Sequence, residues 1–237
     1  MVKHSKRFLV VAEKVDRQQS YSPDEAIDLV KETASAKFDE TVELHLRTNS
    51  DARQSDQLVR GVVTLPHGLG KPMRVLVFAT GEGAASSREA GADYIGDDDL
   101  IKQIEGGWLD FDVALATPDM MGRIGRLGRF LGRRGLMPNP RTGTVVQPQD
   151  LPRAITEAKK GRLEYRMDRT ALIHVAIGKA RFEKKQLLDN LATVMEAVMR
   201  AQPTSVKGQF LRTAFLTTTM GPSVKMDVNV LSTLRVE

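Results

Sequence analysis

The sequence predicts an α/β protein in which both ends of the chain form one domain and the middle forms another. Short apolar runs alternate with helical patterns through the middle, turn-rich segments flank that stretch, and the two parts differ in charge. We therefore expect a discontinuous α+β sandwich formed by residues 1–67 and 160–237. An inserted three-layer α/β domain is expected at residues 68–159.

The middle of the chain carries alternating strand and helix signals. Continuous apolar runs at 73–79 and 111–117 are typical of buried parallel strands, and shorter strand signals lie at 94–95 and 143–146. Helical patterns occupy residues 83–90, 97–107, 120–131 and 148–161. This alternation predicts a parallel sheet with helices on both faces.

The two ends have a different pattern. Ser22-Pro23-Asp24-Glu25 is a strong helix start for the residues up to Ala34, and 182–201 is the longest amphipathic helix. Half-exposed strands are predicted at 41–49, 59–66, 162–168, 171–178 and within 210–224. We expect 162–168 to pair with 171–178. Neither end has enough elements for a domain, so we expect the ends to fold together.

The boundaries are predicted from turns and charge. The segment from Pro66 to Pro72 is turn-rich, and Lys159-Lys160-Gly161 marks the return, so two adjacent crossings form a natural hinge. Residues 1–72 and 159–237 together carry a net charge of +7, whereas 73–158 carry −2. The overall basicity is therefore assigned to the discontinuous domain, and it favours a nucleic acid or another acidic partner.

Composition excludes several classes of protein. The chain has 237 residues, 41% of them hydrophobic, which excludes global disorder. It has no cysteine, and its four histidines lack metal-ligand spacing, so we expect no metal site and no cofactor. No apolar run approaches the roughly 18 residues of a membrane span. A cytoplasmic protein without a membrane partner is expected.

Charge is strongly segregated along the middle of the chain. Residues 120–149 contain six arginines and no acidic residue, whereas 82–119 contain ten acidic residues and two basic ones. Between 122 and 135, glycine, arginine and apolar residues each recur at steps of three and four, which predicts three stripes on a helix. Two interpretations stay open: glycines packed against a neighbouring backbone, or arginines that contact phosphate. The basic candidates are Arg123, Arg126, Arg129, Arg133 and Arg134.

An enzyme has little support from the residues. Thr80-Gly81-Glu82-Gly83-Ala84 is half of a dinucleotide fingerprint, but it lacks the third glycine, and Glu82 would repel a pyrophosphate. Asp97, Asp98 and Asp99 are consecutive at a helix start and do not converge on one metal ion. No nucleophile–base spacing is present, so no catalytic residue is assigned.

Two segments of the discontinuous domain have the chemistry that RNA recognition requires. Lys37-Phe38-Asp39-Glu40-Thr41 places an aromatic ring among charges, and 217–223 combines hydroxyls, a methionine and a Gly-Pro turn. Hydroxyls, backbone amides and a flat apolar surface can read 2′-hydroxyls and bases. The alternative is that the threonines are ordinary strand formers and that Phe38 belongs to the core.

Long motifs give the chain a family resemblance. They are the Met121–Pro140 run with Gly143-Thr144-Val145, the segment 161–179, Thr217–Val224 and Lys37–Leu46. With these motifs the sequence resembles the bacterial ribosomal protein L-one family, the protein of the large-subunit stalk. The resemblance implies a Rossmann-like inserted domain and no enzymatic activity. It also implies binding to 23S rRNA at the mobile stalk, a part in release of deacylated tRNA from the E site, and translational repression through the protein's own operon mRNA.

The same resemblance assigns the residues that contact RNA. Carried over by motif, they are Lys37, Phe38, Thr41, Thr217, Thr219, Met220, Gly221 and Ser223. It further implies a ribosome-associated protein that is a monomer when free. Two alternatives stay open: a free-standing RNA-binding regulator of translation, and a nucleotide-dependent enzyme that uses the inserted domain.

Overall fold

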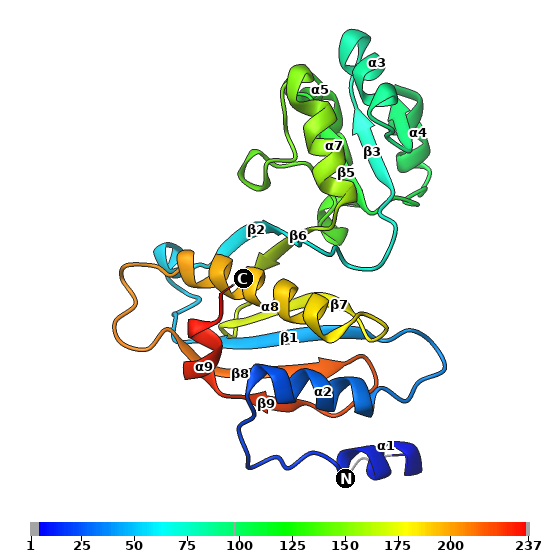
Figure 1. The fold of residues 1–237 in the computed structure, drawn as a ribbon. Coiled ribbons are helices and arrows are strands. Elements are labelled where there is room, and N and C mark those ends of the chain that lie inside the picture. Colours follow the sequence, from blue (N-terminus) through cyan, green and yellow to red (C-terminus); the bar gives the residue numbers. More distant parts are fainter. Residues whose placement is uncertain (1–4, 97, 236–237) are drawn as a thin grey trace. The chain divides into compact units, whose positions relative to one another are not determined.

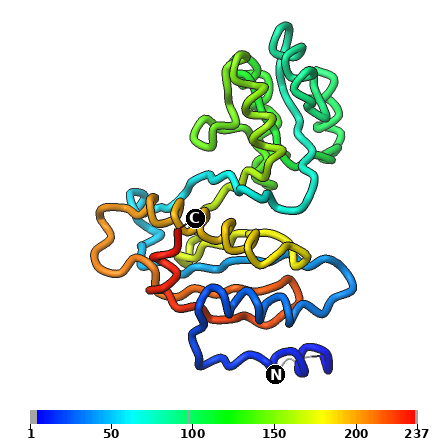
Figure 2. Tube along the Cα trace, viewed as in Figure 1, coloured from blue at the N-terminus to red at the C-terminus, as the bar shows by residue number. Residues whose placement is uncertain are grey.

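The computed structural model describes residues 5–96 and 98–235. The chain divides into two compact units, Met1–Gly70 with Leu163–Glu237, and Lys71–Arg162. Figure 2 shows the blue and red ends of the chain within the same unit. The crossings thus lie at 70/71 and 162/163, three residues beyond the predicted positions.

The charge of the two units differs from the prediction. Lys71, Lys159, Lys160 and Arg162 all belong to the inserted unit, so the two units carry net charges of +3 and +2. The assignment of the basicity to the discontinuous unit is therefore wrong, because four basic residues cluster at the crossings. Net charge alone does not indicate which unit meets a polyanion.

The discontinuous unit is built on a four-stranded antiparallel sheet in the order β7-β1-β8-β9 (Figure 1). Its strands are β1 (Thr41–Thr48), β7 (Leu172–Lys179), β8 (Leu211–Thr218) and β9 (Val224–Met226). β1 comes from before the insertion, whereas both of its neighbours come from after it. Neither end of the chain can complete this sheet alone.

Helices cover one face of this sheet. The helices of the unit are α1 (Lys6–Ala12), α2 (Pro23–Thr33), α8 (Lys184–Arg200) and α9 (Val228–Thr233), with a 3-10 turn η1 (Ser55–Gln57). Val42, Leu44 and Leu46 alternate along β1 and are fully buried in the core shared with α2, α8 and α9. The predicted start of α2 is confirmed: the carboxylate of Glu25 accepts from the Ser22 amide at 3.0 Å, and the Ser22 hydroxyl accepts from the Glu25 amide.

The predicted pairing of 162–168 with 171–178 is wrong. β6 (Arg162–Arg166) pairs with β2 (Arg60–Thr64) in a two-stranded sheet, and β7 pairs with β1. One isolated bridge, Met167 to Ile173, joins the two segments. Between them the Asp168 carboxylate accepts from the amides of Thr170 and Leu172, both at 2.8 Å, and this tight turn sends the strands to different sheets.

The inserted unit has a parallel sheet in the order β4-β3-β5, with helices on both faces. The strands are β3 (Val75–Phe78), β4 (Tyr94–Gly96) and β5 (Val113–Ala116), and the helices are α3 (Gly81–Glu89), α4 (Asp98–Glu105), α5 (Pro118–Ile124), α6 (Gly128–Leu131) and α7 (Leu151–Lys159). Leu76 and Phe78 pack toward α4 and α5, whereas Val75 and Val77 pack toward α7. The predicted α/β layering is confirmed. Asp97 lies outside the described residues.

Two elements of the inserted unit differ from the prediction. The expected strand 143–146 is reduced to one parallel bridge between Ala116 and Val145, preceded by a 3-10 turn, η4 (Pro140–Thr142). The expected helix 120–131 begins at Pro118 and is interrupted by a 3-10 turn at Gly125–Leu127. A further 3-10 turn follows α6 and ends at Gly135, whose φ of 70° lies in the left-handed region that glycine favours. Repeated glycines weaken the helix because each costs up to about 1 kcal/mol relative to alanine.

Among the described residues, the helices lack the combination of length and apolar character that a membrane crossing requires. No described set of three or more His, Asp or Glu side chains is grouped as a metal site would need.

A buried asparagine joins three segments of the discontinuous unit. Asn190 of α8 is fully buried, and its amide nitrogen donates to the carbonyls of Ile177 at 2.7 Å and Gly68 at 3.0 Å. Its amide oxygen accepts from the His67 backbone at 3.2 Å. The side chain therefore fixes the end of the first chain segment onto β7 and α8.

We predict that Asn190→Leu lowers the free energy of unfolding by about 1–3 kcal/mol, because it leaves buried backbone groups without partners. Urea denaturation of the full chain measures the change. Asn229→Leu, at an exposed position of α9, is the matched control and should change stability by less than about 0.5 kcal/mol. Equal stability of the two variants would contradict the assignment of a structural role to Asn190.

Candidate nucleic-acid interface

The structure brings the two predicted RNA-contacting segments together. The loop before β1 carries Lys37 and Phe38, and the loop between β8 and β9 carries Thr219 and Met220. The Thr41 amide donates to the Thr219 hydroxyl at 3.0 Å, and the Thr219 amide donates to the Thr41 carbonyl at 3.1 Å. Residues 178 positions apart in the chain therefore form one surface.

A buried carboxylate joins the same two loops. Glu40 is only 1% exposed, and it lies directly before β1. One of its oxygens accepts from the Ala36 amide at 2.8 Å and the other from the Met220 amide at 2.9 Å. Burial by itself would raise the pKa of Glu40, but these backbone donors outweigh it and hold the pKa below its ordinary value. The charged carboxylate thus fixes the positions of both loops.

Two large apolar side chains project from these loops into solvent. Phe38 is 55% exposed and Met220 is 49% exposed, although both are residue types that normally contribute to a core. Lys37, Thr219 and Ser223 are exposed beside them in the sequence. The alternative that Phe38 belongs to the core is therefore wrong.

The remaining predicted residues shape the β8–β9 loop. The Thr217 hydroxyl donates to the carbonyl of Thr218 at 3.0 Å and also lies near the carbonyls of Gly221 and Pro222. A Cβ added to Gly221 would stand 2.3 Å from the Thr218 hydroxyl oxygen. A side chain at position 221 would therefore displace the Thr218 hydroxyl. The Thr217 hydroxyl is partly engaged within the loop. The structure gives both residues a role in shape.

Sequence reasoning missed two residues of this surface. Glu40 stands in the sequence as one charge in a charged run, and nothing in the sequence shows that its carboxylate is buried. Lys179, at the end of β7, donates to the Thr41 hydroxyl at 2.8 Å and adds a cation to the edge of the surface. Its register opposite Thr41 could be found only from the sheet pairing.

The arginine-rich segment of the inserted unit is partly neutralised. Arg123 pairs with Asp98, and Arg126 pairs with Glu105 at 3.2 Å, so α4 of the acidic segment lies beside the arginines. Within the described residues, the side chains of Arg129, Arg133 and Arg134 make no ion pair or hydrogen bond. In the folded unit, positive charge without an acidic partner among the described residues is therefore found toward the end of this segment, from Arg129 to Arg134.

The glycines of this segment face open space. A Cβ built on Gly122, Gly125, Gly128, Gly132 or Gly135 would meet no described atom within 4 Å outside its own helix backbone. The interpretation that these glycines admit a neighbouring backbone is wrong for this structure. The apolar stripe is confirmed, since Ile124, Leu127 and Leu131 are fully buried. The segment thus presents exposed backbone and arginine on its outer side.

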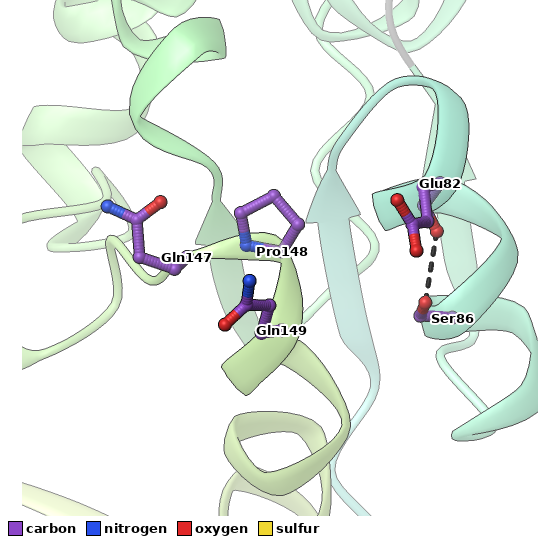
Figure 3. A pocket seen from close by; sticks show the side chains of 5 residues that line it. All are labelled: Glu82, Ser86, Gln147, Pro148 and Gln149. Atoms are coloured by element: carbon purple, nitrogen blue, oxygen red, sulfur yellow. Dashed lines mark hydrogen bonds between the residues drawn. The ribbon is translucent and has the colours of Figure 1, made fainter.

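The turn that resembles half of a dinucleotide fingerprint lines a pocket of the inserted unit (Figure 3). The pocket is formed by Glu82, Ser86, Gln147, Pro148 and Gln149. The Ser86 hydroxyl donates to the Glu82 carbonyl at 3.0 Å, and an anion entering here would meet the Glu82 carboxylate (Figure 3). The pocket is therefore unsuited to a pyrophosphate.

Comparison with known proteins shows the family to which the chain belongs. Residues 30–222 match the model of the Ribosomal protein L1p/L10e family. The chain belongs to this family. It is thus a ribosomal protein of a structural, non-enzymatic family, and the alternative of a nucleotide-dependent enzyme is excluded.

Similar proteins cover nearly the whole chain. The chain is 57% identical to large ribosomal subunit protein uL1 of Thermomicrobium roseum, over 96% of this chain and 95% of the relative. It is 56% identical to the uL1 protein of Chloroflexus aggregans, over 99% of this chain and all of the relative. It is 51% identical to that of Dehalococcoides mccartyi, over 99% of both. Both units are therefore shared with the family.

We predict that Glu40→Gln loosens both loops, because the amide that replaces one oxygen cannot accept from a backbone N–H. The loss should be about 1.5–3 kcal/mol of unfolding free energy, as for hydrogen bonds to charged groups. Since the pKa of Glu40 is lowered, its contribution is present above the ordinary pKa of glutamate and is lost as pH falls through the lowered value. The variant should lack this part of the pH dependence.

Hydrogen exchange of the Ala36 and Met220 amides across pH measures this effect directly. The matched control is Glu32→Gln, which removes an exposed carboxylate paired with Lys14 and should change stability by less than about 1 kcal/mol. Unchanged protection of both amides in Glu40→Gln would show that the carboxylate does not hold the loops.

Proposed function

We propose that this protein is a structural constituent of the large ribosomal subunit that binds 23S rRNA at the mobile stalk. Membership of a ribosomal protein family and the uL1 names of relatives that match end to end support this proposal. We assign RNA binding to one surface of the protein because Glu40 joins two loops there, and Phe38 and Met220 project from these loops into solvent. The discontinuous unit is the RNA-binding unit in this proposal.

The chemistry of the loops suits a structured RNA. Hydroxyls of Thr219 and Ser223 and the backbone near Gly221 bond 2′-hydroxyls in a shallow minor groove, Phe38 and Met220 give apolar contact, and Lys37 neutralises phosphate. Because Glu40 fixes the loops before RNA arrives, little ordering entropy is lost on binding. Recognition is then governed more by shape than by charge.

The same loops would serve the repressor activity. A segment of the operon mRNA that mimics the stalk site presents the same groove and backbone, so it competes for the same residues. Repression and ribosome assembly would therefore respond together to any change in the loops. Co-sedimentation with large subunits through moderate salt distinguishes this proposal from a free-standing regulator, which would not sediment with them.

The arginine-rich segment supports a second RNA contact. Arg129, Arg133 and Arg134 are exposed and lack a partner among the described residues, and the glycines between them let a phosphate backbone approach closely. We propose that this surface meets deacylated tRNA or neighbouring rRNA when the stalk moves inward, and so takes part in release from the E site.

We predict that Met220→Ala lowers affinity for a stalk RNA about tenfold or more without changing the melting temperature. The side chain is half exposed, and the contact of Met220 with Glu40 is made by its backbone amide, which the substitution keeps. Thr219→Ala does not separate RNA binding from stability as cleanly, because the Thr219 hydroxyl also accepts from the Thr41 amide within the fold. Val230→Ala, 45% exposed on α9, is the control and should bind normally.

Binding is measured across a salt series against a scrambled duplex. Nanomolar, sequence-dependent binding with a shallow salt slope is expected for a preformed site that reads shape. Equal and steeply salt-dependent binding to both RNAs, or a fall in melting that matches the loss of affinity in Met220→Ala, would contradict the proposed site.

We predict that Arg129→Glu with Arg133→Glu leaves stalk-RNA binding unchanged but slows release of deacylated tRNA from reconstituted ribosomes severalfold. The two side chains are chosen because they lack the ion pairs of Arg123 and Arg126. Arg153→Glu, on α7 of the same unit and 84% exposed, is the control for a charge reversal outside the arginine-rich segment. Unchanged release kinetics in the double variant would contradict a role for this segment in tRNA release.

A further inference from the structure

The four-stranded sheet has a second face that the helices α2, α8 and α9 do not cover. Side chains alternate across the sheet, so the residues between the core positions of each strand point to this face. In the register of the sheet, His174 of β7 lies opposite His45 of β1, His45 opposite Phe215 of β8, and Phe215 opposite Lys225 of β9. We call these four residues the ring row.

The ring row is accessible. The side chain of His45 is 27% exposed although it is the central ring, His174 is exposed, and Phe215 and Lys225 are half-buried. By contrast, Leu44 and Leu216, the neighbours of His45 and Phe215 on the other face, are fully buried. Three adjacent rings with a cation at one end therefore lie on an open sheet surface.

The two histidines hold each other in place. Their Nδ1 atoms are 2.7 Å apart, so one ring donates and the other accepts, and the ring centroids are 4.9 Å apart at an interplanar angle of 62°. Burial and the neighbouring His174 lower the pKa of His45, while Glu43, whose Oε2 is 3.7 Å from His45 Nε2, opposes this shift. A lowered pKa favours a neutral ring, which offers a face for stacking rather than a charge for phosphate.

The ring row continues the surface assigned to RNA above. One step along the face, Glu43 pairs with Thr217, and one step further Thr41 pairs with Lys179. Thr41 and Thr217 are both candidate RNA contacts, and each step of two residues spans about 7 Å. Cations flank the rings, since Lys225 ends the row and Arg47 is exposed two residues beyond His45. The Glu43 carboxylate between rings and loops disfavours phosphate there but can accept from an amino group of a base.

We propose that the ring row stacks unpaired RNA bases that adjoin the structured segment held by the two loops. This inference rests on the proposed function for the source of the RNA, but its chemistry is separate: rings on an open sheet stack bases of any sequence. Lys225 and Arg47 neutralise the phosphates that connect those bases. A docking protein is disfavoured because the rings of the ring row lie among charged groups, with Lys225 and Arg47 at their flanks and the Glu43 carboxylate beside them.

The test compares two double variants of the full chain. His45→Leu with His174→Leu removes both rings and keeps apolar bulk, whereas His45→Phe with His174→Phe keeps rings and removes the histidine hydrogen bond. His67→Leu, which removes a histidine paired with Asp189 elsewhere in the same unit, is the matched control. Each protein is titrated with three probes. They are a stalk RNA with its unpaired nucleotides, the same RNA with those nucleotides base-paired in a duplex, and an oligouridylate of about twelve nucleotides.

We expect the double leucine variant to lose about tenfold in affinity for the first and third probes, because stacking on one aromatic ring contributes about that factor per base. It should bind the closed duplex normally, and the double phenylalanine variant should bind all three probes nearly as the unchanged protein does. Quenching of a fluorescent base analogue at the unpaired positions reports stacking directly. It should be reduced only in the leucine variant, which keeps Phe215 as the remaining ring of the row.

Unchanged binding of all three probes by the leucine variant overturns the inference. An equal loss on all three probes also overturns it, because the rings would then only support the fold. The proposed function is judged separately by Met220→Ala on the closed duplex. Loss there with no effect of the leucine variant leaves the proposed function standing without the ring row. Ring-dependent binding of oligouridylate without preference for stalk RNA leaves the ring row standing without the proposed function.

Discussion

The carboxylate of Glu40 is the contact on which the candidate RNA surface depends. It is buried, yet it remains charged because backbone N–H groups from two loops donate to it. A buried charge with too few partners would be strongly destabilising, so the two loops and the carboxylate stabilise one another. This is why Phe38 and Met220 can stay exposed in a defined position: their backbones are fixed and their side chains are free to contact a partner.

The same contact is compatible with the insertion that makes this unit discontinuous. Glu40 precedes β1, and Met220 follows β8, so the loops meet only because β1 is paired with β8 in an antiparallel sheet. An inserted unit between β2 and β6 leaves that pairing untouched, since it leaves and re-enters at a two-stranded sheet away from β8. The candidate RNA surface and the point of insertion thus belong to different sheets.

The sequence predicts layering well and pairing poorly. The continuous apolar runs around Leu76 and Leu115 indicate buried parallel strands, because a strand that is buried on both faces has apolar residues at successive positions instead of alternating apolar and polar ones. The partner of β6 could not be predicted, because Leu163 and Tyr165 are equally compatible with a neighbour in sequence and with β2. The burial of Glu40 was hidden for a similar reason: it results from amides contributed by residues up to 180 positions away. The site motifs were identified from resemblance, whereas the contact that unites them required the structure.

The glycines of the arginine-rich segment lower its helix propensity and at the same time expose its backbone to solvent. Four glycines lie within the helical turns and destabilise a helix, and here the helix does break into α and 3-10 turns, held by Ile124, Leu127 and Leu131 in the core. No described neighbour fills the space that the missing side chains leave. The instability is therefore not offset by packing at the glycine positions themselves. The glycines leave the backbone exposed beside arginine, and a phosphate chain can approach such a surface more closely than one covered by side chains. In the proposed function the two units would bind RNA differently, one through fixed shape and the other through charge on a smooth surface.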